Sequence, residues 1–287
     1  MALSRRRFLA AGAGLVAAGG VTVALEPRLR VKAEDLVRDE KRRLEPHGNA
    51  EDIQLTSGSF ASPARRGTET AWVLAVPAAA KQSLPLVVVL HGRGGDHTGA
   101  FGALDLDRAL AKAVATGSAP MAVAAVDGGN HSYYHQRKDG TDVGAMVLEE
   151  LPEQLASHAQ LGGKLGLMGW SMGGYGALHL AQRYGQSKVH AVAASSAALW
   201  RRWQDSAPGA FDGPSDFAAN SVLDHLDQLT VPTRLACGRH DPFIATNREL
   251  VRRKPGVEHV FPEGAHTNAF WRSTNLDQLR FLATALS

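Results

Sequence analysis

The chain has 287 residues, of which 44% are hydrophobic and 21% are charged, and its formal net charge is +3. This composition is ordinary for a globular protein, and it excludes an intrinsically disordered chain and a long coiled coil. The length favours one large α/β domain with short extensions, because single domains of this class commonly reach about 250 residues.

The first residues have the features of an export signal. Arginines at positions 5–7 precede Phe8 and Leu9, and an uncharged, weakly apolar stretch follows as far as Leu25. A charged segment before an apolar one is typical of signal peptides. The order serine, paired arginines, any residue, phenylalanine and leucine resembles the twin-arginine (Tat) consensus. We therefore expect residues 1–24 to be a Tat-type signal peptide, the Tat export machinery to be a partner, and the protein to be exported to the periplasm, the cell envelope or the outside of the cell.

Cleavage of this segment would change the charge balance. It removes three arginines and no acid, so the formal charge of the remaining chain is zero. The basic character thus gives no argument for nucleic-acid binding, and no basic stripe interleaved with aromatics occurs elsewhere. If the segment is retained, it is the only membrane contact that we expect, although its four glycines make a weak spanning helix.

Residues 25–49 carry closely spaced charges of both signs, which predicts a solvated linker. Residues 50–287 are then the folded, catalytic domain. It begins with two strand-like runs, residues 53–60 and 71–76, separated by a polar segment. Their spacing predicts an antiparallel pair at a sheet edge.

From residue 86 onward, buried runs alternate with helical patterns. Continuously apolar runs are typical of parallel strands covered on both faces, and they occur at residues 86–90, 121–126, 165–168, 191–194 and 233–237. Helices are predicted over residues 104–115, 145–159, 175–184, 246–253 and 275–286. This alternation predicts an α/β protein with a mostly parallel central sheet and helices on both faces, the layout of the α/β-hydrolase fold. The single cysteine, Cys237, ends an apolar run and is expected to be a small buried hydrophobe.

The segment Gly169-Trp170-Ser171-Met172-Gly173 lies between the 165–168 run and the 175–184 helix. A serine at such a strand–turn–helix junction, with glycines two residues away on either side, has the pattern of a nucleophile elbow. The glycines allow strand and helix to pack closely around a strained serine. We predict that Ser171 is a nucleophile; the alternative is a simple turn of serine and glycine.

A serine nucleophile needs a histidine base, and that histidine needs a carboxylate. In this fold the chain order is serine, acid, histidine. Asp241 lies in the turn after the 233–237 run, and His266 lies in the loop after a strand-like segment at 258–261, so we predict them as acid and base. Four rivals fit less well. His240 directly precedes the acid, so the chain order would fail, and His259 lies inside a strand. Asp224 and Asp227 lie in an expected helix on the wrong side of the sheet.

Acyl transfer also needs donors for the tetrahedral oxyanion. We predict the backbone amides of Met172, next to the nucleophile, and of Arg93, in the glycine-rich loop that follows the 86–90 strand. The polar loop at 127–135 follows another strand and is predicted to line the substrate site. The residues predicted to contact substrate are His91, Gly92, Asp127, Tyr134, Trp170 and Trp271.

Two polar or aromatic segments leave alternatives open. Asp127, His131 and His135 could in principle bind a metal, but their spacing is not that of a helical zinc motif. We therefore expect a polar loop, with no metal and no cofactor. Residues 200–216 combine aromatic residues and prolines, and they are either a lid or pocket wall, or a loop fastened to the core.

The ten residues from Gly169 to Leu178, together with Asp241 and His266, resemble the esterase branch of the α/β-hydrolases. That branch includes esterase D (S-formylglutathione hydrolase) and the mycobacterial antigen 85 mycolyltransferases. The loop that begins at His91 is similar to the HGGG-type oxyanion loop, with Arg93 in place of a glycine. The resemblance implies a triad of Ser171, Asp241 and His266, a covalent acyl-enzyme and no cofactor.

Together these features predict an exported serine carboxylic-ester hydrolase that acts on a small-molecule or lipid ester. One alternative is an acyltransferase that passes the acyl group to a sugar hydroxyl, as mycolyltransferases do. A second alternative, from another class, is a non-catalytic surface binding protein with the same fold.

Overall fold

The computed structural model describes residues 52–287 of the chain. The predicted signal peptide at residues 1–24 and the predicted linker at 25–49 lie outside the described residues. Within residues 52–287, no helix has both the length and the hydropathy needed to span a bilayer.

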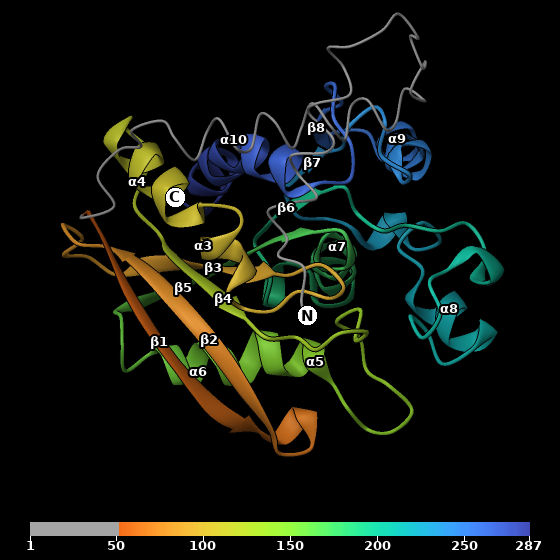
Figure 1. Ribbon diagram of the computed structural model, residues 1–287, viewed down its shortest axis with the longest axis horizontal. Helices are drawn as coiled ribbons and strands as arrows, with labels where there is room; N and C mark the ends of the chain where they lie inside the picture. The colour runs from red at the N-terminus through yellow and green to blue at the C-terminus, as the bar shows by residue number, and fades with distance from the viewer. Residues whose placement is uncertain (1–51) are drawn as a thin grey trace, which may run out of the picture.

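An eight-stranded sheet forms the centre of the molecule, in the order β1-β2-β4-β3-β5-β6-β7-β8 (Figure 1). β1 (Ile53–Ser62) and β2 (Thr68–Pro77) form an antiparallel hairpin at one edge, and β2 also pairs antiparallel with β4. The other pairings are parallel and join β3 (Leu84–Leu90), β4 (Ala122–Val126), β5 (Leu161–Trp170), β6 (Ala191–Ser195), β7 (Thr233–Ala236) and β8 (Glu258–Val260). The predicted α/β-hydrolase layout and its edge hairpin are confirmed.

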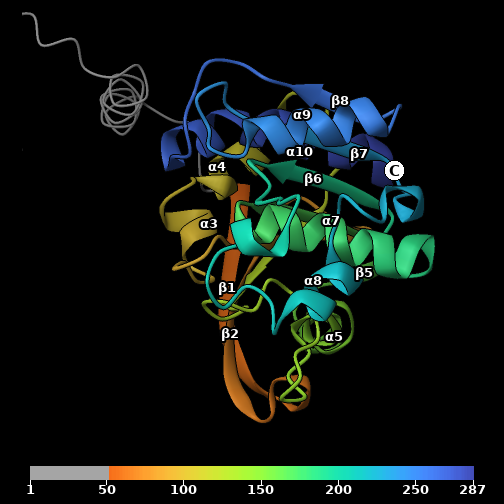
Figure 2. The same ribbon diagram turned by 90° about the vertical axis from the view of Figure 1, so that its right-hand side faces the viewer.

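Helices cover both faces of this sheet, as the two ribbon views show (Figures 1 and 2). Side chains of a strand alternate between faces. In β3, Val87 and Val89 belong to the apolar cluster under α4 (Leu106–Ala115) and α10 (Asn268–Leu286), whereas Leu86, Val88 and Leu90 belong to the cluster under α7 (Met172–Tyr184). Two apolar layers therefore bury the central strands, which explains their uninterrupted apolar sequences.

The remaining helices are α3 (Gly99–Gly102), α5 (Val143–Ala145), α6 (Leu151–Leu155), α8 (Pro214–Asn220) and α9 (Ile244–Arg253). A π-helical turn, Met146–Glu150, joins α5 to α6 just before Pro152, where proline cannot donate a helical hydrogen bond. Two expectations need correction. α10 begins at Asn268 rather than at residue 275, because Thr267 caps it through the Phe270 amide. Asp224 and Asp227 lie in turns and a short 3₁₀ helix, Leu226–Gln228, rather than in the expected α-helix.

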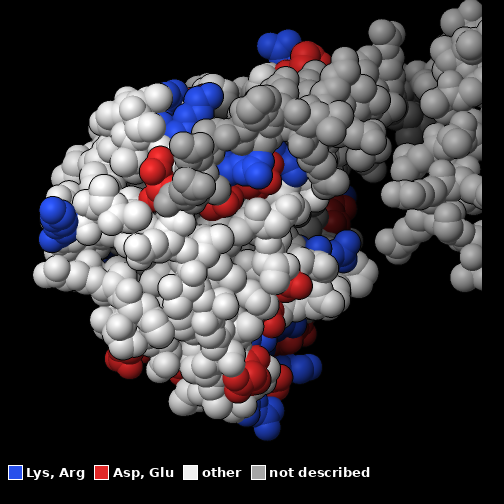
Figure 3. Space-filling model, turned by 60° about the vertical axis from the view of Figure 1, so that its left-hand side comes forward, with Lys and Arg blue, Asp and Glu red and all other residues white. Residues whose placement is uncertain are grey.

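Charges are mixed on the surface of the described residues. Figure 3 shows one face, on which acidic and basic side chains are scattered around a largely uncharged area. Cys237 is fully buried, as predicted, and burial raises the pKa of its thiol, so it packs as a small apolar side chain.

Glycine brings α7 close to the sheet at the point where β5 ends. A Cβ atom on Gly173 would overlap the carbonyl oxygen of Leu90 in β3, and a Cβ on Gly169 would overlap the carbonyl of Gly173. Backbone therefore packs directly on backbone here, which only glycine permits.

We expect Gly173→Ala to lower the free energy of unfolding by about 3 kcal/mol or more, because the neighbouring main chain cannot move aside. Gly163→Ala is the matched control, since a Cβ at Gly163 meets nothing within 4 Å. Urea unfolding of both variants checks this, and equal stability of the two would contradict the packing argument.

Candidate active site

Ser171 occupies the apex between β5 and α7 in a strained backbone conformation. Its φ and ψ angles are 55° and −117°, a region that non-glycine residues rarely adopt. Hydrogen bonds on both sides hold it there: its amide donates to the Ser195 carbonyl (3.0 Å), and its carbonyl accepts from the Ala198 amide (3.0 Å). The hydroxyl is thereby presented at the carboxyl end of the parallel strands.

Asp241 and His266 lie beside this hydroxyl, as predicted. His266 Nε2 is 2.9 Å from Ser171 Oγ, and His266 Nδ1 is 2.8 Å from Asp241 Oδ2. A carboxylate can only accept, so Nδ1 carries the proton, and Nε2 is free to accept from the serine hydroxyl. The Asp241 carboxyl is buried, and its other oxygen accepts from the Phe243 amide. The three side chains thus form one hydrogen-bonded chain.

Backbone contacts bring the loops that contain Asp241 and His266 together. The His240 amide donates to the Gly264 carbonyl (2.9 Å), and the Arg239 amide donates to the Pro262 carbonyl (2.9 Å). A Cβ on Gly238 would overlap the Gly264 carbonyl, so this approach depends on glycine. The loops after β7 and β8 therefore form one unit, which fixes the distance from carboxylate to imidazole.

The glycine-rich loop after β3 approaches Ser171 from the other side. A Cβ on Gly92 would lie 2.9 Å from Trp170 Nε1 and 3.4 Å from Ser171 Cβ. The Arg93 amide donates to no acceptor within residues 52–287, and neither does the Met172 amide, which opens α7. Two backbone donors are therefore free near the serine hydroxyl.

His91 fixes the orientation of the peptide that contains the Arg93 amide. Its Nδ1 lies 2.8 Å from the Gly92 carbonyl oxygen, which also accepts from the Gly95 amide (3.0 Å), and its Nε2 accepts from the Gly128 amide (3.0 Å). Because N–H and C=O point in opposite directions across a trans peptide, the held Gly92 carbonyl turns the Arg93 N–H away from His91.

Two predicted substrate contacts need correction. Tyr134 is fully buried, and its hydroxyl donates to the His91 carbonyl (3.2 Å), so it supports the glycine-rich loop from beneath. His91 is 1% exposed and has both ring nitrogens engaged, so it too is a support and not a substrate ligand. Burial decides both cases, because a side chain enclosed by protein cannot meet a ligand.

The other predicted contacts lie closer to the reacting groups. Trp271 packs edge-on against His266, with ring centroids 4.9 Å apart, and Trp170 packs against Trp271 at 6.1 Å. Gly92 lies against Trp170, as above. Asp127 is half-buried, accepts from the Gly129 amide (2.9 Å), and lies 3.6 Å from His91 Nε2. Their contact with substrate stays a prediction.

Aromatic rings continue on the other side of His266. Phe243 lies 5.4 Å from the imidazole, Trp200 lies 5.7 Å from Phe243, and Tyr133 lies 5.5 Å from Trp200, measured between ring centroids. Trp200 thus fastens the 200–216 segment to this row of rings, and the role of the segment as a lid or pocket wall stays a prediction. We call the row of Phe243, Trp200 and Tyr133 the aromatic wall.

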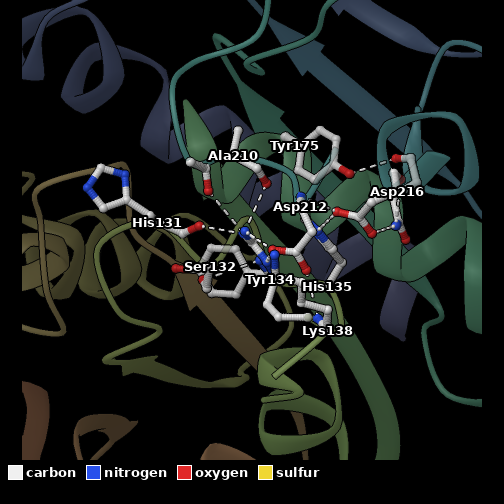
Figure 4. Close-up of polar contacts among 12 residues, drawn as sticks. His131, Ser132, Tyr134, His135, Lys138, Tyr175, Ala210, Asp212 and Asp216 are labelled. Atoms are coloured by element: carbon white, nitrogen blue, oxygen red, sulfur yellow. Dashed lines mark hydrogen bonds and ion pairs between the residues drawn. The ribbon is translucent and has the colours of Figure 1, made fainter. Parts of the chain in front are cut away.

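Ion pairs tie the 200–216 segment to the loop after β4. Arg137 donates to Asp212 through two nitrogens (3.2 and 2.8 Å) and to the carbonyls of His131, Gly209 and Ala210. His135 Nε2 lies 3.1 Å from Asp216 Oδ2. Figure 4 shows His135, Asp212 and Asp216 gathered between the two segments.

The rival residues are engaged elsewhere. His240 pairs with Glu263 at the surface (2.8 Å), and His259 lies in β8 with Nδ1 3.1 Å from the Val257 carbonyl. No group of three or more His, Cys, Asp or Glu residues within 52–287 is arranged to hold a metal ion. In particular, His135 is turned toward Asp216 rather than toward Asp127 and His131.

Comparison with known proteins identifies the family. Residues 67–282 match the model of the family described as "Putative esterase". The chain belongs to this family. It is accordingly a hydrolase of the carboxylesterase type, on the esterase branch of the α/β-hydrolase fold.

Solved structures of similar fold include other esterases. A ferulic acid esterase has a TM-score of 0.72 at 19% identity, over 82% of this chain and 99% of its own. An S-formylglutathione hydrolase from Agrobacterium tumefaciens has a TM-score of 0.67 at 17% identity (84% and 99%). MPT51 of Mycobacterium tuberculosis has a TM-score of 0.63 at 16% identity (82% and 99%). These likenesses show the shared fold, and no curated protein sequence matches this esterase.

Sequence reasoning missed several residues that shape the site of this esterase. Phe243 follows Asp241 by two positions, and a search for apolar residues next to the predicted acid could have found it. Arg137 and Asp212 are 75 positions apart, and no local pattern joins them. Arg65, which is buried and donates to the Asp127 carbonyl (2.7 Å), likewise has no sequence signal.

The strained serine leads to a stability prediction. We expect Ser171→Gly to be more stable than Ser171→Ala by about 1 kcal/mol, because glycine adopts the observed φ without a Cβ clash. Both variants lack the hydroxyl, so the comparison isolates the backbone. Urea unfolding measures the difference, and a more stable alanine variant would refute it.

Proposed function

We propose that this protein is an exported serine esterase that hydrolyses carboxylic esters through an acyl-enzyme on Ser171. The observation that carries the proposal is the hydrogen-bonded chain from Ser171 Oγ through the His266 imidazole to the buried Asp241 carboxylate. A strained serine, an adjacent imidazole and a buried acid are the groups that nucleophilic acyl transfer requires.

In the proposed first half-reaction, Ser171 Oγ attacks the ester carbonyl while His266 Nε2 takes the hydroxyl proton. Asp241 holds the imidazole in the required tautomer and stabilises the imidazolium. The proton then passes from Nε2 to the departing alkoxide, the C–O bond breaks, and the alcohol leaves. In the second half-reaction, His266 Nε2 takes a proton from water as the water oxygen attacks the acyl carbon. The bond from the acyl carbon to Ser171 Oγ then breaks, the proton passes from Nε2 to Oγ, and the carboxylic acid is released.

The amides of Arg93 and Met172 are the proposed oxyanion donors. Each is free of a protein acceptor within the described chain and lies on a segment that contacts or adjoins Ser171. A single donor of this kind contributes about 3 to 4 kcal/mol to transition-state stabilisation.

Export is proposed from residues 1–24, whose arginine pair, Phe8 and Leu9 match a Tat-type signal. The Tat machinery is then a partner. The Tat pathway carries folded proteins, which is compatible with a domain that contains one buried cysteine and needs no disulfide.

Covalent labelling tests the nucleophile. We expect a fluorophosphonate to label the wild-type protein stoichiometrically and to leave Ser171→Ala unlabelled, with hydrolysis of 4-nitrophenyl acetate lost by a factor of at least about 10⁴ in that variant. Intact-mass spectrometry reads the label. A labelled Ser171→Ala variant would assign the nucleophile elsewhere, and an unlabelled wild type would favour a non-catalytic binding protein.

Two substitutions of His91 test the oxyanion loop. In His91→Asn the amide nitrogen can replace Nδ1 as donor to the Gly92 carbonyl, whereas in His91→Gln the amide can replace only the Nε2 contact with Gly128. We expect kcat to fall by about 10²- to 10³-fold in the glutamine variant, with KM little changed, and to stay within about tenfold of wild type in the asparagine variant.

Thermal unfolding of both His91 variants provides the control. If kcat falls equally in the two variants and follows their loss of stability, His91 supports the fold only and does not orient the Arg93 amide.

A further inference from the structure

Asn247 is a buried polar residue in the first turn of α9, and the mechanism proposed above makes no use of it. Its exposed fraction is zero, and its side-chain nitrogen donates to the carbonyls of Ala197 (2.8 Å) and Phe243 (2.9 Å). Its Oδ1 accepts from no donor within residues 52–287. A buried acceptor without a partner costs stability. An apolar side chain of similar size would avoid that cost, so the two donated bonds are what asparagine adds at this position.

The bond to Ala197 ends on the peptide that holds Ser171. The Ala197 carbonyl and the Ala198 amide belong to one peptide group, and the Ala198 amide donates to the Ser171 carbonyl (3.0 Å). Because C=O and N–H point in opposite directions across a trans peptide, Asn247 holds one end of this group and the other end holds Ser171. The Ala197 carbonyl also accepts from the Leu199 amide (2.9 Å), which lies in the same loop. Asn247 supplies the contact that reaches this loop from α9.

The bond to Phe243 fixes the same side chain on the turn of Asp241. The Phe243 amide donates to Asp241 Oδ1 (2.8 Å), and the Phe243 ring lies 5.4 Å from the His266 imidazole, measured between centroids. The Phe243 carbonyl accepts from the backbone amide of Asn247 (3.0 Å) as well as from its side chain. Asn247 is thereby attached firmly to the turn that contains the proposed acid, and from there it reaches the peptide that holds Ser171.

Asn247 lies where two parts of the proposed site meet. The loops after β7 and β8 form one unit, which fixes the distance from Asp241 to His266, and the elbow between β5 and α7 belongs to another. The pairing of β6 with β7 joins these parts within the sheet, whereas the Asn247 bond joins them beyond the strand ends. The gap of 2.9 Å between Ser171 Oγ and His266 Nε2 crosses the same junction.

We propose that Asn247 is a positioning residue: by joining the turn of the proposed acid to the peptide that holds Ser171, it sets the distance from Ser171 Oγ to His266 Nε2. This inference rests on the proposed function, because that distance matters only where a proton passes between these two atoms. The hydrogen bonds of Asn247 end on carbonyl groups and not on the reacting atoms. Misplacement of reacting groups by about 1 Å can cost about 100-fold in rate.

Two substitutions of Asn247 test this role. Asn247→Leu has nearly the same size and removes both bonds together with the unpaired oxygen. In Asn247→Ser the hydroxyl can still donate to the Phe243 carbonyl four residues back, as helical serines do, but it is too short to reach Ala197. We expect kcat for 4-nitrophenyl acetate to fall by about 10- to 100-fold in both variants, and KM to change by less than about twofold, because both half-reactions use His266 Nε2 and substrate binding does not.

A spectroscopic measurement separates positioning from a general loss of structure. The proton between His266 Nδ1 and Asp241 Oδ2 is expected to give a strongly deshielded NMR signal. We expect this signal to keep its wild-type position in both Asn247 variants, because backbone bonds between the loops after β7 and β8 hold that pair. The rate of fluorophosphonate labelling should fall in parallel with kcat, while labelling still reaches completion.

Gln182→Met is the matched control. Gln182 is also a buried helical amide, and its Nε2 donates to the carbonyls of Val222 and His225, both at 2.9 Å. It lies about 16 Å along α7 from Ser171. Methionine has nearly the size of glutamine and removes both bonds. We therefore expect this variant to lose at least as much stability in thermal unfolding as Asn247→Leu, but to keep kcat within about twofold of wild type.

Three results would overturn the positioning role and leave the esterase mechanism intact. They are a kcat within about twofold of wild type in either folded Asn247 variant, an equal fall of kcat in Gln182→Met, and loss of the deshielded signal together with kcat. If one Asn247 variant fails to fold, the other decides. Failure of the fluorophosphonate to label the wild type would instead overturn the proposed function itself.

Discussion

The steric constraint at the end of β5 is the feature on which the rest of the site depends. Backbone meets backbone where Gly173 lies on the Leu90 carbonyl, and this leaves no room for a relaxed turn between β5 and α7. Ser171 is therefore held at positive φ with its hydroxyl outward. The strain at Ser171 costs free energy of folding. Burial of the apolar layers on either side of the sheet offsets this cost, and their close packing prevents the turn from relaxing.

The reacting groups come from four separate strand ends. Ser171 follows β5, the proposed acid Asp241 follows β7, the proposed base His266 follows β8, and the proposed oxyanion loop follows β3. Parallel strands place all of these ends at one edge of the sheet, so short loops suffice to bring the groups within hydrogen-bonding distance. The lack of a side chain at Gly92 and Gly238 lets these segments approach one another. The topology thus supplies proximity, and the local contacts supply orientation.

A second level of support lies beneath the reacting groups. His91, Tyr134 and Arg65 have little or no exposure, and their hydrogen bonds run to the backbone of the loops after β3 and β4. Rigid hydrogen-bonded support of this kind keeps the proposed oxyanion donors oriented before substrate arrives, which is the condition for electrostatic stabilisation of a transition state. In the same way, the ion pair between Arg137 and Asp212 holds the segment that carries Trp200 of the aromatic wall.

The sequence by itself determined the fold class, the elbow and the identities of the predicted nucleophile, acid and base. Each of these depends on local pattern: apolar runs mark the buried strands, glycine spacing marks the elbow, and chain order places Asp241 and His266 after the last strands. The sequence could not assign His91 and Tyr134 correctly, because a polar side chain after a strand can face either the cleft or the protein beneath it. Only the tertiary structure decided that choice, because burial and hydrogen-bond partners arise when loops from different strands pack together. It also decided the pairing of residues as distant as Arg137 and Asp212.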